Sequence, residues 1–129
     1  MGLNPTFLQI VRQQGIHPRQ RADLARLETV MLVGSPAMPD VFAWTREELG
    51  NDLWVSSQSG GTEFCSGLLA GSPLLPTFPG SIQAPALGVD ALAFDDDGRP
   101  VKGQVGELVV RQPLPSMPIF LWGDEGDTR

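Results

Sequence analysis

Proline and glycine are so dense between residues 71 and 88 that no long helix can form there. Prolines lack the backbone amide hydrogen that a helix interior needs, and their rings clash with the preceding turn. We therefore expect the chain to consist of two parts. These are residues 1–70, a partial α/β subdomain, and residues 71–129, a partial β subdomain with a proline-rich tail.

Apolar residues in the first part alternate between helical spacing and short continuous runs, which are typical of buried strands. Each predicted strand runs into a polar loop that contains glycine. This alternation predicts an α/β fold with a parallel sheet, in which ligands bind in loops beyond the carboxyl ends of the strands. The helices are expected over residues 4–14 and 39–49, and the strands over Val30 to Val33 and Leu53 to Val55.

The second part has the pattern of an antiparallel hairpin or the edge of a small barrel. Residues 89–95 favour a strand, Asp95 to Gly98 is a strong turn signal, and residues 106–111 are expected to form the return strand. The spacing of the three adjacent aspartates does not fit a calcium-binding loop. We therefore expect these acids to lie at a solvated hairpin tip.

Composition excludes several classes of function. With 9 basic and 15 acidic residues the formal charge is -6, so we expect no nucleic-acid partner. The chain has one cysteine, Cys65, and one histidine, His17, which excludes an internal disulfide framework and makes a zinc cluster improbable. No apolar run approaches the roughly 20 residues of a membrane span, and no secretory signal is visible. We expect a cytoplasmic protein.

The most informative motif is the loop from Ser56 to Glu63, which follows the second predicted strand. Paired glycines let a backbone approach a ligand closely. A hydroxyl beside a carboxylate, Thr62 and Glu63, can bind a phosphate and its magnesium ion. The alternative is a turn leading into a helix, with Thr62 as the N-cap and Glu63 in the first turn. Spacing alone favours the alternative.

A second loop, Gly34-Ser35-Pro36, follows the first predicted strand and could frame the same crevice. It has neither the Gly-Lys-Ser/Thr ending of a Walker loop nor a GxGxxG pattern. We expect Cys65 to be a packed core thiol, because the only histidine is remote in sequence, and His17 to be a surface residue.

Together these segments resemble the AMP-forming acyl-CoA synthetase superfamily of adenylate-forming enzymes, and within it the acetoacetyl-CoA synthetases. The run SSQSGGTEFCSG, residues 56–67, resembles the serine-glycine-glycine-threonine-acid-cysteine segment of that family. The other stretches that agree in order and approximate spacing are residues 33–44, 75–88, 93–110 and 111–127.

The resemblance implies an enzyme that activates a carboxylic acid with ATP and magnesium to an acyl-adenylate and then forms a thioester with coenzyme A. By the same resemblance Thr62 contacts the α-phosphate, Glu63 helps to hold magnesium, and Gly34, Ser35 and Pro36 lie along the adenine. Preorganised donors and a metal would stabilise the charge that develops at phosphorus.

The resemblance also assigns the residues before Thr62. Ser59 stands where many relatives place an aromatic ring against the adenine, and Gly61 completes the nucleotide-binding set. Gly60 stands where acetyl-CoA synthetases place a bulky tryptophan that closes the acyl pocket. Glycine there implies room for a longer acid such as acetoacetate.

Several parts of such a synthetase are missing from the chain, among them the lysine-containing phosphate loop and the C-terminal lysine. We therefore expect an internal fragment of the large N-terminal domain, inactive by itself, whose partner is the remainder of the same protein. One alternative is a fragment of a synthetase for another short acid. The other is an inactive remnant that acts only as a binding module.

Overall fold

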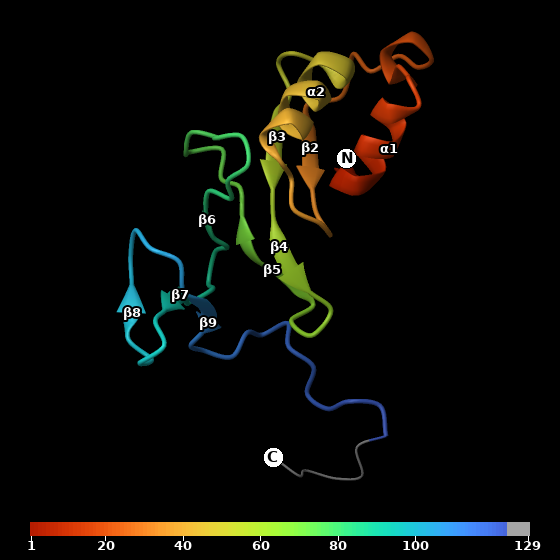
Figure 1. Cartoon of the computed structure of the whole chain (residues 1–129). Helices are drawn as coiled ribbons and strands as arrows, with labels where there is room; N and C mark the ends of the chain where they lie inside the picture. The colour runs from red at the N-terminus through yellow and green to blue at the C-terminus, as the bar shows by residue number, and fades with distance from the viewer. Residues whose placement is uncertain (124–129) are drawn as a thin grey trace. The chain divides into compact units, whose positions relative to one another are not determined.

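The computed structural model describes residues 1–123 (Figure 1). The chain divides into two compact units. The first comprises Met1–Ser59 and Leu69–Ala84, and the second comprises Gly60–Leu68 and the described residues from Pro85 onward. These units are assembled from alternating segments of the chain. The expected division into the subdomains 1–70 and 71–129 stays a prediction.

The first unit contains a parallel sheet in the order β1-β2-β3, as the helix–strand alternation predicted. Its register places Met31 opposite both Gly2 and Ser56. Strand β1 was not expected, because two residues are too short to show a pattern. The elements in chain order are β1 (Gly2–Leu3), α1 (Pro5–Gln13), the 3₁₀ helix η1 (Pro18–Gln20), β2 (Thr29–Leu32), α2 (Pro39–Leu49) and β3 (Trp54–Ser57).

Both helices contribute apolar side chains to one core with the sheet. Val30 and Leu32 of β2 are 0 % exposed, because alternate residues of a strand point to the same face. Leu8 of α1 and Val41 of α2 belong to the same buried cluster. The helices therefore cover one face of the sheet, as expected for strand–helix–strand units.

The proline-rich stretch contains no helix, as predicted, and the Gln83 side chain holds part of it in place. The Gln83 carboxamide accepts a hydrogen bond from the Ser72 amide at 3.0 Å. Its nitrogen donates to the carbonyls of Ser72, Leu75 and Pro76 at 2.7–3.1 Å. These bonds satisfy backbone groups that a helix or sheet would otherwise pair.

A second three-stranded sheet has the order β4-β5-β6. Its strands are β4 (Ser59–Gly61), β5 (Ser66–Ala70) and β6 (Ala84–Pro85). The residues from Ser59 to Gly61 were expected to be part of a loop, so the structure corrects that prediction. A run of serine and glycine carries no strand signal, and the pairing with β5 decides its conformation.

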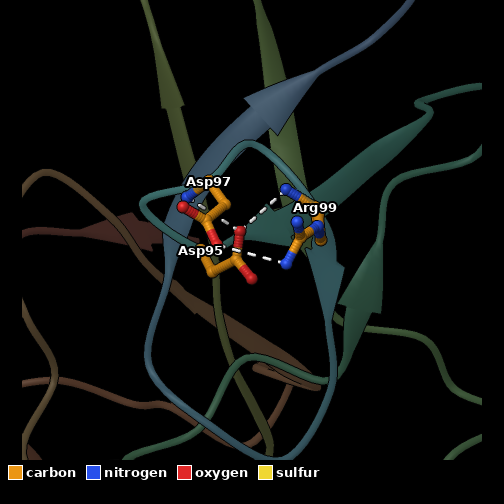
Figure 2. Close-up of polar contacts among 3 residues, drawn as sticks. All are labelled: Asp95, Asp97 and Arg99. Carbon is orange, nitrogen blue, oxygen red and sulfur yellow. Dashed lines mark hydrogen bonds and ion pairs between the residues drawn. The ribbon is translucent and has the colours of Figure 1, made fainter.

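The third sheet is antiparallel, with the order β8-β7-β9, and lies in the second unit. The predicted turn is confirmed: an Asp95 carboxylate oxygen accepts hydrogen bonds from the amides of Asp97 and Arg99, and Arg99 pairs with Asp97 at 3.1 Å (Figure 2). The strand directly after this turn is β8, and the expected return strand pairs with the other edge of β7. The strands are β7 (Ala91–Phe94), β8 (Pro100–Val101) and β9 (Glu107–Val110).

Within residues 1–123, no helix has the length and apolar character needed to cross a membrane. Met117 and the nearby tail residues form no strand, and Ile119, Phe120 and Trp122 are exposed. The end of the predicted tail, residues 124–129, lies outside the described residues.

Candidate functional site

Thr62 and Glu63 lie in the tight turn that connects β4 to β5. Figure 1 shows this turn between the two labelled strands. The Phe64 amide donates to the carbonyl of Gly61, and the Cys65 amide donates to that of Thr62, both at 3.2 Å. The chain therefore returns at once into β5. The alternative prediction, in which Thr62 caps a helix, is wrong, and both predicted side chains are exposed at the tip of a hairpin.

The carboxylate of Glu63 folds back over the hairpin, so that a Cβ atom added to Gly61 would collide with Glu63 Oε2. Neither this carboxylate nor the Thr62 hydroxyl has a hydrogen-bond partner within the described part of the chain. Both groups are therefore available to a ligand. A carboxylate oxygen is the hard ligand that magnesium prefers.

The residues of the turn fit a magnesium ion that the protein would hold together with a bound phosphate. Among residues 1–123 there is no group of three or more histidine, cysteine, aspartate or glutamate side chains that could hold a metal ion alone. Magnesium commonly binds through one or two carboxylates together with substrate phosphates. The single free carboxylate of Glu63 fits this mode of binding.

Cys65 is exposed at the end of the turn, so the expectation of a packed core thiol is wrong. Its φ of 48° lies in the left-handed region, which a residue closing a tight turn can adopt, and its Sγ lies 3.2 Å from the carbonyl oxygen of Thr62. His17 is exposed, as expected, and its Nδ1 lies 2.8 Å from Oε1 of Glu48.

The hairpin tip is anchored by Ser116, for which the sequence indicated no role. The Ser116 hydroxyl donates to the carbonyl of Phe64 at 2.6 Å, across 52 positions of the chain. Ser116 lies within residues 111–127, one of the stretches that resemble the family. No local pattern could have revealed this contact, because its partner is remote in sequence.

Gly60 has a different surrounding from the one expected. A Cβ atom at this position would collide with the carbonyl oxygen of Ser66 and lie 2.8 Å from Gly67 Cα. The backbone of β5 thus occupies the space that a side chain at position 60 would need. The structure does not support the expectation that glycine leaves open space here; Gly60 instead permits close approach of the two strands.

Replacing Gly60 with alanine is expected to destabilise the hairpin by about 1–3 kcal/mol, because backbone cannot move aside as a flexible side chain can. Amide hydrogen exchange at Gly67 and Leu68 measures the change. The matched control is Gly2→Ala, since a Cβ atom at Gly2 meets no atom within 4 Å. Equal exchange in the two variants would contradict the prediction.

The second predicted loop, Gly34 to Pro36, follows the carboxyl end of β2 in the first unit. Gly34 has a φ of 92°, and a Cβ atom there would lie 2.8 Å from Asn4 Nδ2, so only glycine fits without strain. The Ser35 hydroxyl is half-buried and Pro36 is exposed. Ser59 is also exposed. That the loop from Gly34 to Pro36 and the segment from Ser56 to Glu63 frame one crevice stays a prediction.

The first unit also has a hollow of about 630 Å³, lined by side chains that include Arg19, Asp23 and Leu53. These residues precede β2 and β3, so the hollow lies at the amino ends of the strands. Ligands of open α/β sheets bind at the carboxyl ends. None of the predicted site residues lines this hollow.

Comparison with known proteins decides the family. The family described as AMP-binding enzyme matches residues 1–118 of the chain. The chain belongs to the AMP-binding enzymes. Membership confirms the resemblance that the motifs suggested.

Three known proteins illustrate the similarity. The solved structure of acetoacetyl-CoA synthetase from Streptomyces lividans matches with a TM-score of 0.84 and 43 % identity, covering 95 % of this chain and 20 % of that one. Acetoacetyl-coenzyme A synthetase of Rhizobium meliloti is 37 % identical over 95 % of the chain, and acetyl-coenzyme A synthetase of Thiobacillus denitrificans is 34 % identical over 93 %. The chain covers 19 % of each of these two relatives.

The structural match confirms the expected fold class, an α/β part of an adenylate-forming enzyme followed by antiparallel strands. The coverage figures mean that the chain spans about a fifth of the length of the relatives that it matches.

Proposed function

We propose that the chain forms one wall of the active site of an acid–thiol ligase that activates acetoacetate with ATP and transfers it to coenzyme A. The observation that carries this proposal is the exposed turn on which a free hydroxyl, Thr62, adjoins a free carboxylate, Glu63. The names of the Rhizobium and Streptomyces relatives support the choice of acid.

The proposed reaction has two steps. A carboxylate oxygen of acetoacetate forms a bond to the α-phosphorus of ATP, and the bond from that phosphorus to the bridging oxygen breaks, so pyrophosphate leaves with the electron pair. The thiolate sulfur of coenzyme A then forms a bond to the acyl carbon. The bond from that carbon to the phosphate oxygen breaks, and AMP leaves.

The proposed roles follow from the chemistry of each side chain. The Thr62 hydroxyl donates a hydrogen bond to an α-phosphate oxygen, where negative charge accumulates in the transition state. Glu63 supplies an oxygen ligand to magnesium, which when bound would neutralise phosphate charge. The backbone of Gly34 and the ring of Pro36 lie along the adenine, and Ser59, Gly60 and Gly61 bring the hairpin backbone close to the nucleotide.

A second candidate is a ligase for another short acid, which the 34 % identity to an acetyl-coenzyme A synthetase favours. Gly60 was expected to discriminate between acetate and longer acids. The backbone of β5 occupies the space beside Gly60, so this glycine does not discriminate between the acids. A comparison of substrates is therefore needed to separate the two candidates.

The proposal also names partners and a location. The partners are the small acid, the nucleotide, coenzyme A and the remainder of the same protein. A nucleic acid is not among them, because binding its phosphate backbone needs a basic surface, and this chain has 9 basic against 15 acidic residues. We place the enzyme in the cytoplasm, in keeping with the free thiol of Cys65 in this chain.

The test uses the complete polypeptide encoded by the reading frame that carries this sequence. We expect acetoacetate-dependent release of pyrophosphate from ATP, faster with acetoacetate than with acetate or butyrate. Faster release with acetate would instead support the second candidate. No release with any acid would contradict the ligase proposal and leave the binding-module alternative. Calorimetric titration of the 129-residue chain alone with ATP and magnesium is the control, and we expect no submicromolar binding.

A further inference from the structure

The Ser35 hydroxyl points into the N-terminus of α1 and contacts two of its residues. It donates to Asn4 Oδ1 at 3.3 Å. It accepts from the Thr6 hydroxyl at 3.1 Å and from the Thr6 amide at 3.3 Å. The loop from Gly34 to Pro36 is therefore attached to a helix that lies 29 positions earlier in the chain.

These three bonds use the full capacity of the hydroxyl, which has one hydrogen to donate and two lone pairs to accept with. Ser35 has no side-chain capacity left for a ligand in this arrangement. The expected contact between Ser35 and a nucleotide would therefore involve its backbone. The side chain instead holds the loop, while Pro36 presents the exposed surface.

The element that holds the loop is itself well anchored. Asn4 Oδ1 caps α1 by accepting from the amides of Thr6 at 2.8 Å and Phe7 at 3.3 Å. Leu8, one turn later, is buried in the core. On the other side of Asn4, the carbonyl of Leu3 accepts from the Val33 amide, immediately before the loop.

We propose that Thr6 is a positioning residue that sets the affinity of the enzyme for ATP through Ser35. This inference rests on the proposed function, in which the Gly34–Pro36 loop lies along the adenine. When the hydrogen bond from the Thr6 hydroxyl to Ser35 is lost, fewer contacts hold the loop, and it spends less time in the conformation that accepts the ring. The apparent dissociation constant then rises in inverse proportion to the population of that conformation.

The test compares Thr6→Val and Thr6→Ser in the complete polypeptide. Valine keeps the shape of the side chain but removes the donated hydrogen bond, which contributes about 0.5–1.5 kcal/mol, so KM for ATP should rise roughly 2- to 12-fold. We expect kcat and KM for the acid to stay unchanged. Serine should restore KM for ATP, because it keeps the hydroxyl.

A double-mutant cycle checks that Thr6 acts through Ser35. Ser35→Ala alone should raise KM for ATP, and adding Thr6→Val should raise it little further, since both changes break the same contact. The matched control is Thr29→Val, whose hydroxyl makes no hydrogen bond within the described residues. An unchanged KM for ATP in Thr6→Val, or an additive double variant, would overturn the inference.

A second readout does not depend on turnover. Thr6→Val should speed amide hydrogen exchange at Gly34, Ser35 and Ala37, and Thr29→Val should not. If the wild-type polypeptide releases no pyrophosphate, the proposed function fails and the role of Thr6 in ATP binding fails with it. If the wild type is active and exchange in the loop does not respond to Thr6→Val, the inference fails alone.

Discussion

Replacing Glu63 with glutamine in the complete polypeptide is expected to lower kcat for pyrophosphate release about 100-fold or more, the size of effect seen when one preorganised electrostatic group is removed. Glutamine keeps the shape of the side chain but removes its charge. In the proposed site that charge holds magnesium against the phosphates. Since the proposed contact of Glu63 is with magnesium and not with the acid, KM for acetoacetate should change little.

The measurement is the rate of pyrophosphate release at several magnesium concentrations. Glu63→Gln should need more magnesium than the wild type to reach half of its own maximal rate. The matched control is Glu107→Gln, which makes the same change at an exposed position of β9. If kcat of Glu63→Gln stays within twofold of the wild type, Glu63 does not have the proposed role.

Replacing Leu32 with alanine is expected to lower the free energy of unfolding of the first unit by about 2–5 kcal/mol. Leu32 is fully buried between the sheet and the helices, so the truncation loses apolar burial and leaves a cavity. This loss is a large fraction of the 5–15 kcal/mol that typically holds a domain folded.

Urea unfolding followed by tryptophan fluorescence measures this loss. Trp44 is buried and Trp54 half-buried in the first unit, whereas Trp122 is already exposed and contributes little change. Leu87→Ala is the matched control, because the same atoms are removed from a fully exposed side chain. A similar unfolding midpoint for both variants would show that Leu32 does not lie in a packed core.

Helices and buried strands were predictable from short stretches of sequence. The second helix, expected over residues 39–49, is α2 (Pro39–Leu49), and the first is one residue shorter at each end than expected. Their signals are local: a proline in the first turn, apolar residues at helical spacing, and glycine after the last turn. The Asp95 turn was predictable for the same reason.

Elements whose partner is distant were not predictable. The strands β1 and β8 have two residues each, and only the neighbouring strand shows that they are strands. The glycines of β4 give no strand signal by themselves, which left both a helix start and a loop open for the residues around Thr62. Pairing with β5 decides between them.

The candidate site likewise has features that the sequence predicts and features that depend on residues distant in the chain. The identity of its chemical groups, a hydroxyl and a carboxylate after paired glycines, was evident from the order of residues. The order of residues did not indicate that these groups are exposed on a hairpin tip, or that β5 closes the space beside Gly60. It also did not indicate the left-handed backbone of Cys65 or the hydrogen bond between the Ser35 hydroxyl and Thr6.

The amino-acid order alone therefore determined the two α-helices, the buried strands β2 and β3, and the family to which the motifs point, because periodicity and motif are properties of neighbouring residues. The folded chain alone decided which side chains remain free to meet a ligand. A hydroxyl becomes free or engaged through atoms that approach it from remote parts of the chain, and only packing brings those atoms together.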